Sequence, residues 1–356
     1  MRHAIIMAGG AGERLWPLSR RNRPKQVLRL FSGKSLLRQS FERVTHVLDP
    51  SVVYVITNDT HLPFVAEELP EIPEENMIGE PVGRDTAAAV GMATAIVARR
   101  DPDATVGIFT ADHIITPMDR FAAAVGRAYA MAEEHDDSLV TMGITPTRPD
   151  TNYGYVHRGE PVADGVFRVR KFTEKPDLEL ARQYLASGEY YWNSGMFAWK
   201  AATILAELKR HLVATHHAVL EIAGVWDTEQ RRAKLESLYP NLKKTSIDFA
   251  VMEHARKVLV VEMDCNWVDV GSWSAIESVI EPDDEGNVNV CREALHMGSH
   301  ENIVVSEEDH LIATIGVEGL IIVHSPDATL VCTKEDAANL KELVKEIRAD
   351  YAEKHL

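Results

Sequence analysis

Apolar positions follow two kinds of pattern over residues 3–143. Continuous apolar runs of strand length occupy 3–7, 51–57, 76–80, 105–109 and 139–143. Segments with helical periodicity lie between them, at 35–47, 85–100 and 118–134. Strands that alternate with helices of this length are typical of β-α-β units. The pattern therefore predicts an α/β fold with a mainly parallel sheet, whose ligands bind beyond the carboxyl ends of the strands.

The pattern changes near residue 152 and again after Pro282. Alternating apolar positions predict strands at 153–156, 167–172 and 191–199, and a further strand is predicted at 258–262. Helices are predicted at 178–187, over most of 201–239, and at 246–254, where the helix is capped. We expect this middle third to form a lid over the binding crevice.

After Pro282, short apolar runs alternate with turn residues, and a single helix is predicted at 334–354. The spacing suits either a small sandwich or a few coils of a short left-handed β-helix. We place a catalytic domain at 1–281 and a small β-rich C-terminal domain with a terminal helix at 282–356. The default interpretation of the second domain is a structural or dimerising part without chemistry.

Composition limits the class of partner. The chain has 356 residues, a formal net charge of −16 and no apolar run of transmembrane length, so we expect no membrane partner. The acidic balance and the lack of a basic stripe argue against nucleic acid. The three cysteines, Cys265, Cys291 and Cys332, have no C-x-x-C spacing, which argues against a disulfide framework or a zinc site and favours a cytoplasmic protein.

A glycine-rich segment follows the first predicted strand. Gly9, Gly10 and Gly12 allow the backbone to approach a ligand closely. The following cations stand out in an acidic chain and suggest a polyanionic ligand, with phosphates held by backbone N–H groups: Arg14, Arg20, Arg21, Arg23 and Lys25. The alternative is a structural strand-to-helix turn, but such a turn needs neither Arg14 nor Lys25.

Two better-known phosphate loops are excluded. A dinucleotide fingerprint needs a third glycine where this chain has Leu15. A Walker A loop needs a glycine where Leu28 stands, so residues 31–34 are interpreted as a turn that opens the helix at Ser35.

Two aspartates are candidate metal ligands. Asp112 follows the strand at 105–109, and Asp269 lies in W-V-D-V-G-S-W at a predicted strand–helix junction. Carboxylates beside bound phosphates need a divalent cation between them, and Mg²⁺ requires only one or two protein ligands. The alternative for Asp112 is a turn or N-cap carboxylate. Asp264 is a fallback ligand, and no histidine has metal-ligand spacing.

Several polar residues suit substrate binding. Lys25 is a point charge suited to a phosphate that gains charge during reaction, although most lysines are solvated. Glu174, Lys175 and Asn193 interrupt apolar or aromatic segments, which suits recognition of sugar hydroxyls. Buried polar residues with satisfied hydrogen bonds are the alternative.

Together these segments resemble the sugar nucleotidyltransferases, and within them a bacterial branch that acts on mannose 1-phosphate. The matching motifs are G-G-A-G-E-R-L-W-P-L-S-R at 9–20, P-K-Q at 24–26, E-P-V-G-R-D-T-A-A-A at 80–89, A-D-H at 111–113, N-Y-G-Y-V at 152–156, F-T-E-K-P at 172–176, W-N-S-G-M-F at 192–197 and W-V-D-V-G-S-W at 267–273. The resemblance implies a Rossmann-like domain, a Mg²⁺ cofactor and transfer of GMP from GTP to α-D-mannose 1-phosphate, with release of pyrophosphate. A homodimer is also expected.

The resemblance also implies roles for individual residues. It assigns catalysis to Arg14, Lys25, Asp112 and Asp269, with the two aspartates as Mg²⁺ ligands. It assigns nucleotide binding to Ala8, Gly9, Gly10, Gly12, Glu80, Gly83, Arg84, Asp85 and Thr86. It assigns the sugar phosphate to Gly154, Glu174, Lys175 and Asn193. Relatives often carry Asn where Asp85 stands, and Asp cannot donate a hydrogen bond, which puts the role of this position in doubt. The alternatives are another base or sugar phosphate, and a non-catalytic scaffold subunit.

Overall fold

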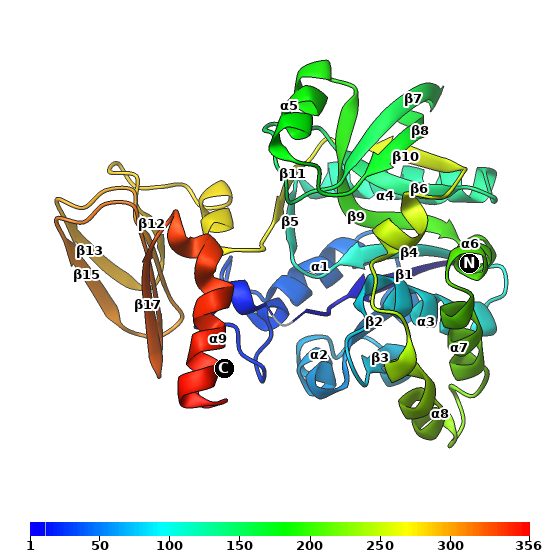
Figure 1. Cartoon of the computed structure of the whole chain (residues 1–356), viewed down its shortest axis with the longest axis horizontal. Helices are drawn as coiled ribbons and strands as arrows, with labels where there is room; N and C mark the ends of the chain where they lie inside the picture. Colours follow the sequence, from blue (N-terminus) through cyan, green and yellow to red (C-terminus); the bar gives the residue numbers. More distant parts are fainter. Residues whose placement is uncertain (11) are drawn as a thin grey trace. The chain divides into compact units, whose positions relative to one another are not determined.

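In the computed structural model, residues 1–10 and 12–356 are described, and they form two compact units (Figure 1). Ala11, within the glycine-rich motif, lies outside them. Unit 1 comprises Met1–Gly9, Phe41–Thr110 and Ile115–Asn266, and unit 2 comprises Gly10–Ser40, Ala111–Ile114 and Trp267–Leu356. The domain boundary at 281/282 remains a prediction. The compact units group the segment after the first strand with the C-terminal part of the chain.

Within its described residues, unit 1 contains one nine-stranded sheet in the order β3-β2-β1-β4-β9-β6-β10-β8-β7. β1 (Arg2–Met7), β2 (Val53–Asn58), β3 (Met77–Glu80) and β4 (Thr105–Thr110) are parallel, as are β6 (Leu139–Ile144) and β10 (Val258–Glu262). β7 (Tyr155–Ala163), β8 (Val166–Thr173) and β9 (Tyr190–Lys200) pair antiparallel. The predicted α/β class is confirmed. The predicted lid is wrong, because β7 to β10 continue this sheet.

The helices around this sheet lie where the sequence predicts helical segments, except for the one at Leu62–Glu68, which the pattern did not predict. They are α1 (Leu36–Thr45), α2 (Leu62–Glu68), α3 (Asp85–Arg100), α4 (Met118–Glu134), α5 (Leu178–Ser187), α6 (Ala201–His211), α7 (Val213–Gly224) and α8 (Arg231–Leu238). The buried alanines of α3 allow close packing, and a Cβ on Gly91 would lie only 3.0 Å from Leu208 of α6. The helix predicted at 246–254 is a π-helix at Asp248–Met252.

The C-terminal strands of unit 2 stack in successive coils. β12 (Val288–Val290), β14 (Ile303–Ser306) and β16 (Leu320–Ser325) pair in parallel, and β17 (Ala328–Thr333) closes this sheet antiparallel. β13 (Glu293–Met297) and β15 (Leu311–Ile315) form a second parallel pair. Ile303 faces Val288 on one side and Ile321 on the other, so residues one turn apart meet as in a β-helix. The helix α9 (Leu340–Tyr351) follows.

One apolar core runs through unit 2. Leu15 and Trp16, just after the glycine-rich loop, pack in the same cluster as Trp273, Ile303 and Ile321. The C-terminal coils therefore share their core with the segment that carries the loop. The default interpretation of these coils as a structural or dimerising part did not include this shared core. None of the helices formed by the described residues has the length and apolarity needed to cross a membrane.

Candidate active site

The glycine-rich loop lies directly against Lys25. Gly12 has φ +64°, and a Cβ placed on it would lie 2.8 Å from Cβ of Lys25, so a glycine is required there. The Ser19 hydroxyl donates to the Gly12 carbonyl at 2.5 Å and fixes the return of the loop. Gly10 also has a positive φ of +110°. Gly12, Ser19 and Lys25 thus form one local structure within unit 2.

Lys25 forms an ion pair with Asp112. Both side chains are largely buried, with 13% and 21% of their surface exposed. Burial alone would raise the pKa of Asp112, but the charge of Lys25 and its hydrogen bond lower that pKa to about 2. Burial would lower the pKa of Lys25, but the carboxylates of Asp112 and Asp269 raise it. Each group therefore remains charged near neutral pH.

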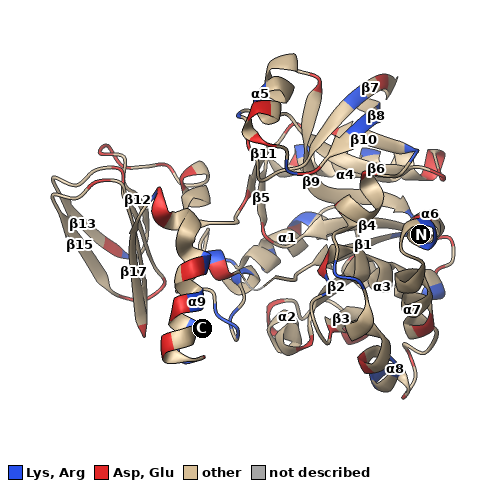
Figure 2. Ribbon diagram, viewed as in Figure 1, with Lys and Arg blue, Asp and Glu red and all other residues tan. Residues whose placement is uncertain are grey.

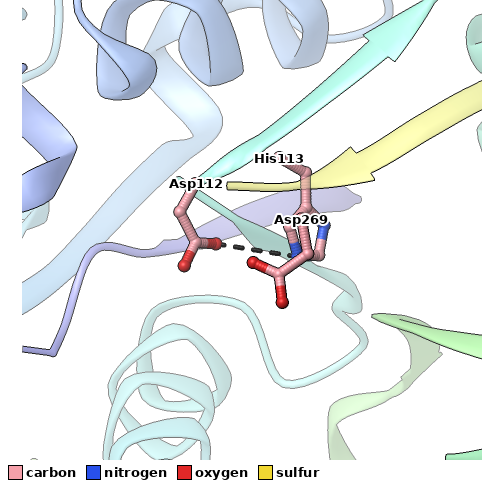
Figure 3. Close-up of side chains that lie close together, drawn as sticks. All are labelled: Asp112, His113 and Asp269. Carbon is pink, nitrogen blue, oxygen red and sulfur yellow. Dashed lines mark ion pairs between the residues drawn. The ribbon is translucent and has the colours of Figure 1, made fainter. Parts of the chain in front are cut away.

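Asp269 completes this cluster. Ligand atoms of Asp112, His113 and Asp269 all lie within 4.8 Å of one another (Figure 3). The amide of Val270 donates to the Asp112 carbonyl at 3.1 Å, which joins the end of β11 (Asn266–Asp269) to the segment that follows β4. A Cβ on Gly271 would lie 3.3 Å from Nη2 of Arg14 and 3.5 Å from both carboxylate oxygens of Asp269. The four predicted catalytic residues are thus gathered in unit 2.

The donor set fits a hard divalent cation. Two carboxylates are the ligands that Mg²⁺ and Mn²⁺ accept when phosphates and waters supply the remaining positions. The indole N–H of Trp267 donates to Nδ1 of His113 at 3.1 Å, so a neutral His113 carries its proton on Nε2 and offers no lone pair there. Asp264 is 82% exposed and pairs with Arg120, so it is not part of this cluster.

The rest of the basic segment has a different role from the predicted one. Arg20 donates to Asp327 at 2.7 Å, and Arg23 lies 2.5 Å from Glu307. Arg21 is mostly exposed, 3.8 Å from Glu353. The helix α9 in the same unit carries both acidic and basic residues (Figure 2). Arg20 and Arg23 therefore attach the loop segment to the C-terminal part, and of the five predicted phosphate cations Arg14 and Lys25 lie at the cluster.

The predicted nucleotide residues Glu80, Gly83, Arg84 and Asp85 lie at the end of β3 and the start of α3 in unit 1. Glu80 is buried, and Tyr239 donates to its Oε1 at 2.5 Å. Burial raises the pKa of Glu80 to about 7, although hydrogen bonds from Tyr239 and from the Arg84 backbone oppose this. A Cβ on Gly9 would lie 3.8 Å from the other oxygen, Oε2, so the carboxylate lies close to the end of β1.

Other residues of this set have structural partners. Ala8 is buried, and its carbonyl accepts a hydrogen bond from Thr57. Thr86 accepts the amide of Ile247 at 2.9 Å. Asp85 has φ +66° and accepts the Thr86 amide at 2.8 Å, so it supports the first turn of α3 without being its N-cap residue. Asp, like Asn, is one of the few residues other than glycine that tolerate this left-handed conformation.

The predicted sugar residues also come together in unit 1. The amide of Asn193 donates to the Gly154 carbonyl at 2.8 Å. A Cβ on Gly154 would lie 2.3 Å from Oε2 of Glu174, so only glycine fits between them. Lys175, with φ +46°, pairs with Oε1 of Glu174 at 3.3 Å. Burial raises the pKa of Glu174, against the lowering effect of Lys175.

Three residues beside these groups were missed by the sequence analysis: His113, Tyr239 and Asp248. Asp248 accepts from Asn193 Nδ2 at 2.8 Å, and Tyr239 binds Glu80 over a separation of 159 residues. The A-D-H motif at 111–113 was the available signal for His113. Asp248 and Tyr239 carried no comparable signal, because each lies in a helical segment whose partners are distant in sequence.

Comparison with known proteins agrees with this architecture. A family model described as "Nucleotidyl transferase" matches residues 3–286, and one described as "MannoseP isomerase/GMP-like beta-helix domain" matches residues 293–347. The chain belongs to the nucleotidyl transferase family.

Within that family, the chain is similar to mannose-1-phosphate guanylyltransferases. It is 39% identical to a putative enzyme of that name from Vibrio cholerae serotype O1 over 97% of this chain and 74% of the relative. It is also 39% identical to the Escherichia coli K12 enzyme over 99% of this chain and 75% of that protein. A crystal structure from Thermus thermophilus, titled a mannose-1-phosphate geranyltransferase, has a TM-score of 0.88 and 34% identity, and the match covers 98% of this chain and 99% of that one. The resemblance found in the sequence is confirmed.

Proposed function

We propose that the protein transfers GMP from GTP to α-D-mannose 1-phosphate and releases pyrophosphate, with GDP-mannose as product. The observation that carries the proposal is the cluster of Lys25, Asp112 and Asp269 beside a glycine-rich loop. The relatives named mannose-1-phosphate guanylyltransferase, about 39% identical over nearly the whole chain, supply the substrate pair.

The reaction needs no general base. The phosphate of the sugar is already an anionic nucleophile that attacks the α-phosphorus of GTP in line with the departing pyrophosphate. Mg²⁺ held by Asp112 and Asp269 would supply charge neutralisation. Lys25, which forms an ion pair with Asp112 in the structure, would then bind a phosphate oxygen, and Arg14 would bind a second. Orientation and charge stabilisation thus provide the catalysis.

We assign the remaining residues by the same proposal. Gly9, Gly10 and Gly12 let backbone N–H groups approach the triphosphate. Glu80 accepts hydrogen bonds from the guanine, with Gly83 and Arg84 beside it. Glu174, Lys175 and Asn193 bind the sugar phosphate next to Gly154. Since the three cysteines are unpaired, we also infer a reducing, cytoplasmic compartment.

A substrate grid tests the proposal. Pyrophosphate release by purified protein is measured with Mg²⁺ for GTP, ATP, UTP and dTTP, each with mannose 1-phosphate and with glucose 1-phosphate. One dominant signal for GTP with mannose 1-phosphate is expected, and EDTA should abolish it. A dominant signal for another pair of nucleotide and sugar phosphate overturns the substrate assignment. If no pair releases pyrophosphate, a non-catalytic scaffold is favoured.

We further propose that a second copy of the chain covers the outer face of β13 and β15. Leu295, Met297, Leu311 and Ile315 are each more than half exposed, and the parallel register places Met297 opposite Ile315. A contiguous apolar face is unusual on a monomer, and the same face on two copies is self-complementary about a twofold axis. Sedimentation should show a dimer that Met297→Glu converts to a monomer, whereas Leu178→Glu, on the exposed side of α5, should leave it intact. A wild-type monomer contradicts this proposal.

A further inference from the structure

Three carboxylates, those of Glu174, Asp248 and Glu253, lie close to the residues of unit 1 that are predicted to bind the sugar phosphate. Asn193 donates to Oδ1 of Asp248 at 2.8 Å, and the backbone amide of Glu174 donates to Oε1 of Glu253 at 3.0 Å. Burial, followed by the charge of Glu174, raises the pKa of Asp248. Burial also raises the pKa of Glu174, with a smaller contribution from the charge of Glu253, so Glu174 lies close enough to both carboxylates to repel them. Such a concentration of acceptors is unfavourable unless a ligand supplies donors.

One acceptor in this cluster lacks a donor. The Glu174 side chain is 10% exposed, and its Oε2 has no hydrogen-bond partner among the described residues. Lys175 is engaged by the other oxygen, Oε1. A buried carboxylate oxygen without a partner costs free energy, which a bound O–H or N–H donor recovers. A ligand with several hydroxyl groups matches this arrangement.

The orientation of Asn193 brings Asp248 into the same arrangement. Oδ1 of Asn193 accepts hydrogen bonds from the Thr141 hydroxyl at 3.1 Å and from the Gly195 amide at 3.2 Å. The amide oxygen is therefore committed, and Nδ2 is turned toward Asp248. Asp248 begins the π-helix that ends at Met252, and π-helical turns are frequent at functional sites. Burial, followed by the charge of Glu174, raises the pKa of Asp248 to about 7, a cost that Asn193 only partly offsets.

We propose that Asp248 is a specificity-determining residue that accepts a hydrogen bond from one hydroxyl group of the sugar phosphate. Asn193 uses Oδ1 of Asp248, and a carboxylate has further lone pairs for a second donor. This inference rests on the proposed function, because it assumes that the Glu174 and Asn193 cluster binds a sugar. It adds a residue from the π-helix to the residues predicted from the sequence.

Deoxygenated substrates distinguish a direct contact from a structural role. The affinities of mannose 1-phosphate and of its 2-, 3-, 4- and 6-deoxy analogues are measured for the wild type and for Asp248→Asn, by calorimetry and as KM at saturating GTP. The variant should bind mannose 1-phosphate about 10- to 100-fold more weakly, with KM for GTP unchanged. For one analogue, the one lacking the hydroxyl that Asp248 contacts, wild type and variant should bind equally.

A constant ratio of wild-type to variant affinity across all five sugars overturns the proposal, because Asp248 would then act only by holding Asn193. Asp137→Asn, at an exposed acidic position paired with Lys257, is the matched control and should change no affinity. Asp248→Ser supplies the same comparison if Asp248→Asn does not fold. Normal turnover by the wild type together with a constant ratio rejects the role of Asp248 alone, whereas a wild type that binds no sugar phosphate rejects both proposals.

Discussion

At the scale of single residues, Lys25 and Asp112 are oppositely charged groups that would exchange partners during a reaction on phosphates. In the structure they form an ion pair and neutralise each other while largely buried. A cation at Asp112 and a phosphate at Lys25 would replace this pair with two new ones. The ion pair therefore favours the charged form of both groups.

Removal of either partner should lower turnover strongly. We expect Lys25→Ala and Asp112→Ala each to reduce kcat/KM for guanylyl transfer by about 10²-fold or more, because each loses one charge partner of the transition state. Steady-state pyrophosphate release measures both. Lys257→Ala, which removes an exposed lysine, serves as the control and should be near normal. Near-normal turnover of either test variant would remove that residue from the site.

Glu80 should make stability depend on pH. Its folded-state pKa of about 7 exceeds the 4.5 of a free glutamate, so the folded protein binds more protons between these values. Stability contributed by protonated Glu80 is therefore lost as pH rises through this window. Relative to Glu80→Gln, the wild-type free energy of unfolding should fall by at most about 3 kcal/mol between about pH 4.5 and pH 8. Urea titrations across this range measure the difference, and a pH-independent difference would contradict a buried, ionising Glu80.

Some residues of the candidate site could be predicted because their neighbours in sequence supply the reason. Gly12 and Lys25 belong to one segment, and Asp112 and Asp269 each lie at the end of a strand. Tyr239 and Asp248 could not be found this way, because burial and hydrogen bonds formed across distant segments define them. Arg20 was misinterpreted for the same reason, since its partner Asp327 is far along the chain.

At the scale of elements, the W-N-S-G segment shows how a strand places polar groups in an apolar sheet. The register between β6 and β9 shifts between Thr141 and Gly143, opposite Asn193. Gly195 takes φ +69°, and Ser194 donates to the Met142 carbonyl at 2.7 Å, so this irregularity is satisfied internally. Bulges of this kind redirect side chains beside binding sites.

Periodicity was sufficient for elements with strong local patterns. The helices at 85–100, 118–134 and 178–187 and the strand at 258–262 have the predicted bounds. Periodicity did not reveal β5 (His113–Thr116), which is short, or the π-helix at Asp248–Met252. Nor did it show that β7 to β10 join the main sheet, because strand pairing depends on contacts between distant segments.

Gly154 offers a test at the start of β7. Gly154→Ala places a methyl group 2.3 Å from the present position of Oε2 of Glu174, so that the carboxylate must move. We expect KM for the sugar phosphate to rise about 10-fold or more with little change in KM for GTP, because the shift displaces a carboxylate that we propose binds the sugar phosphate. Gly126→Ala in α4 meets open space and should leave both constants unchanged. Equal effects of the two substitutions would contradict the assigned role of Glu174.

At the scale of the whole molecule, the C-terminal coils belong to the same compact unit as the candidate metal ligands. Ile321 of β16 and Trp273, which follows Asp269 closely in the chain, lie in one core. The N–H of Trp273 also donates to the Trp16 carbonyl at 2.9 Å. The sequence could predict a β-rich tail, but a core shared by residues 15 and 321 leaves no local pattern.

Destabilising this core should therefore affect the candidate metal ligands Asp112 and Asp269. We expect Ile321→Ala to cost about 2–5 kcal/mol, as for other fully buried aliphatic residues, and to abolish Mn²⁺ binding at the temperature where unit 2 unfolds. Calorimetry and Mn²⁺ titration over the same temperatures measure this. Ile204→Ala in the core of unit 1 is the matched control and should not lower the temperature at which unit 2 unfolds. Mn²⁺ binding that persists after unit 2 has unfolded would contradict the shared core.

The central claim is that a sugar phosphate attacks the α-phosphorus of GTP, and the fate of labelled phosphates tests it most directly. Purified protein is incubated with Mg²⁺, mannose 1-phosphate and GTP that carries ³²P at either the α or the γ position. We expect the α label in GDP-mannose and the γ label in pyrophosphate. Label from the γ position on the sugar, or released as orthophosphate while the sugar is consumed, would contradict it.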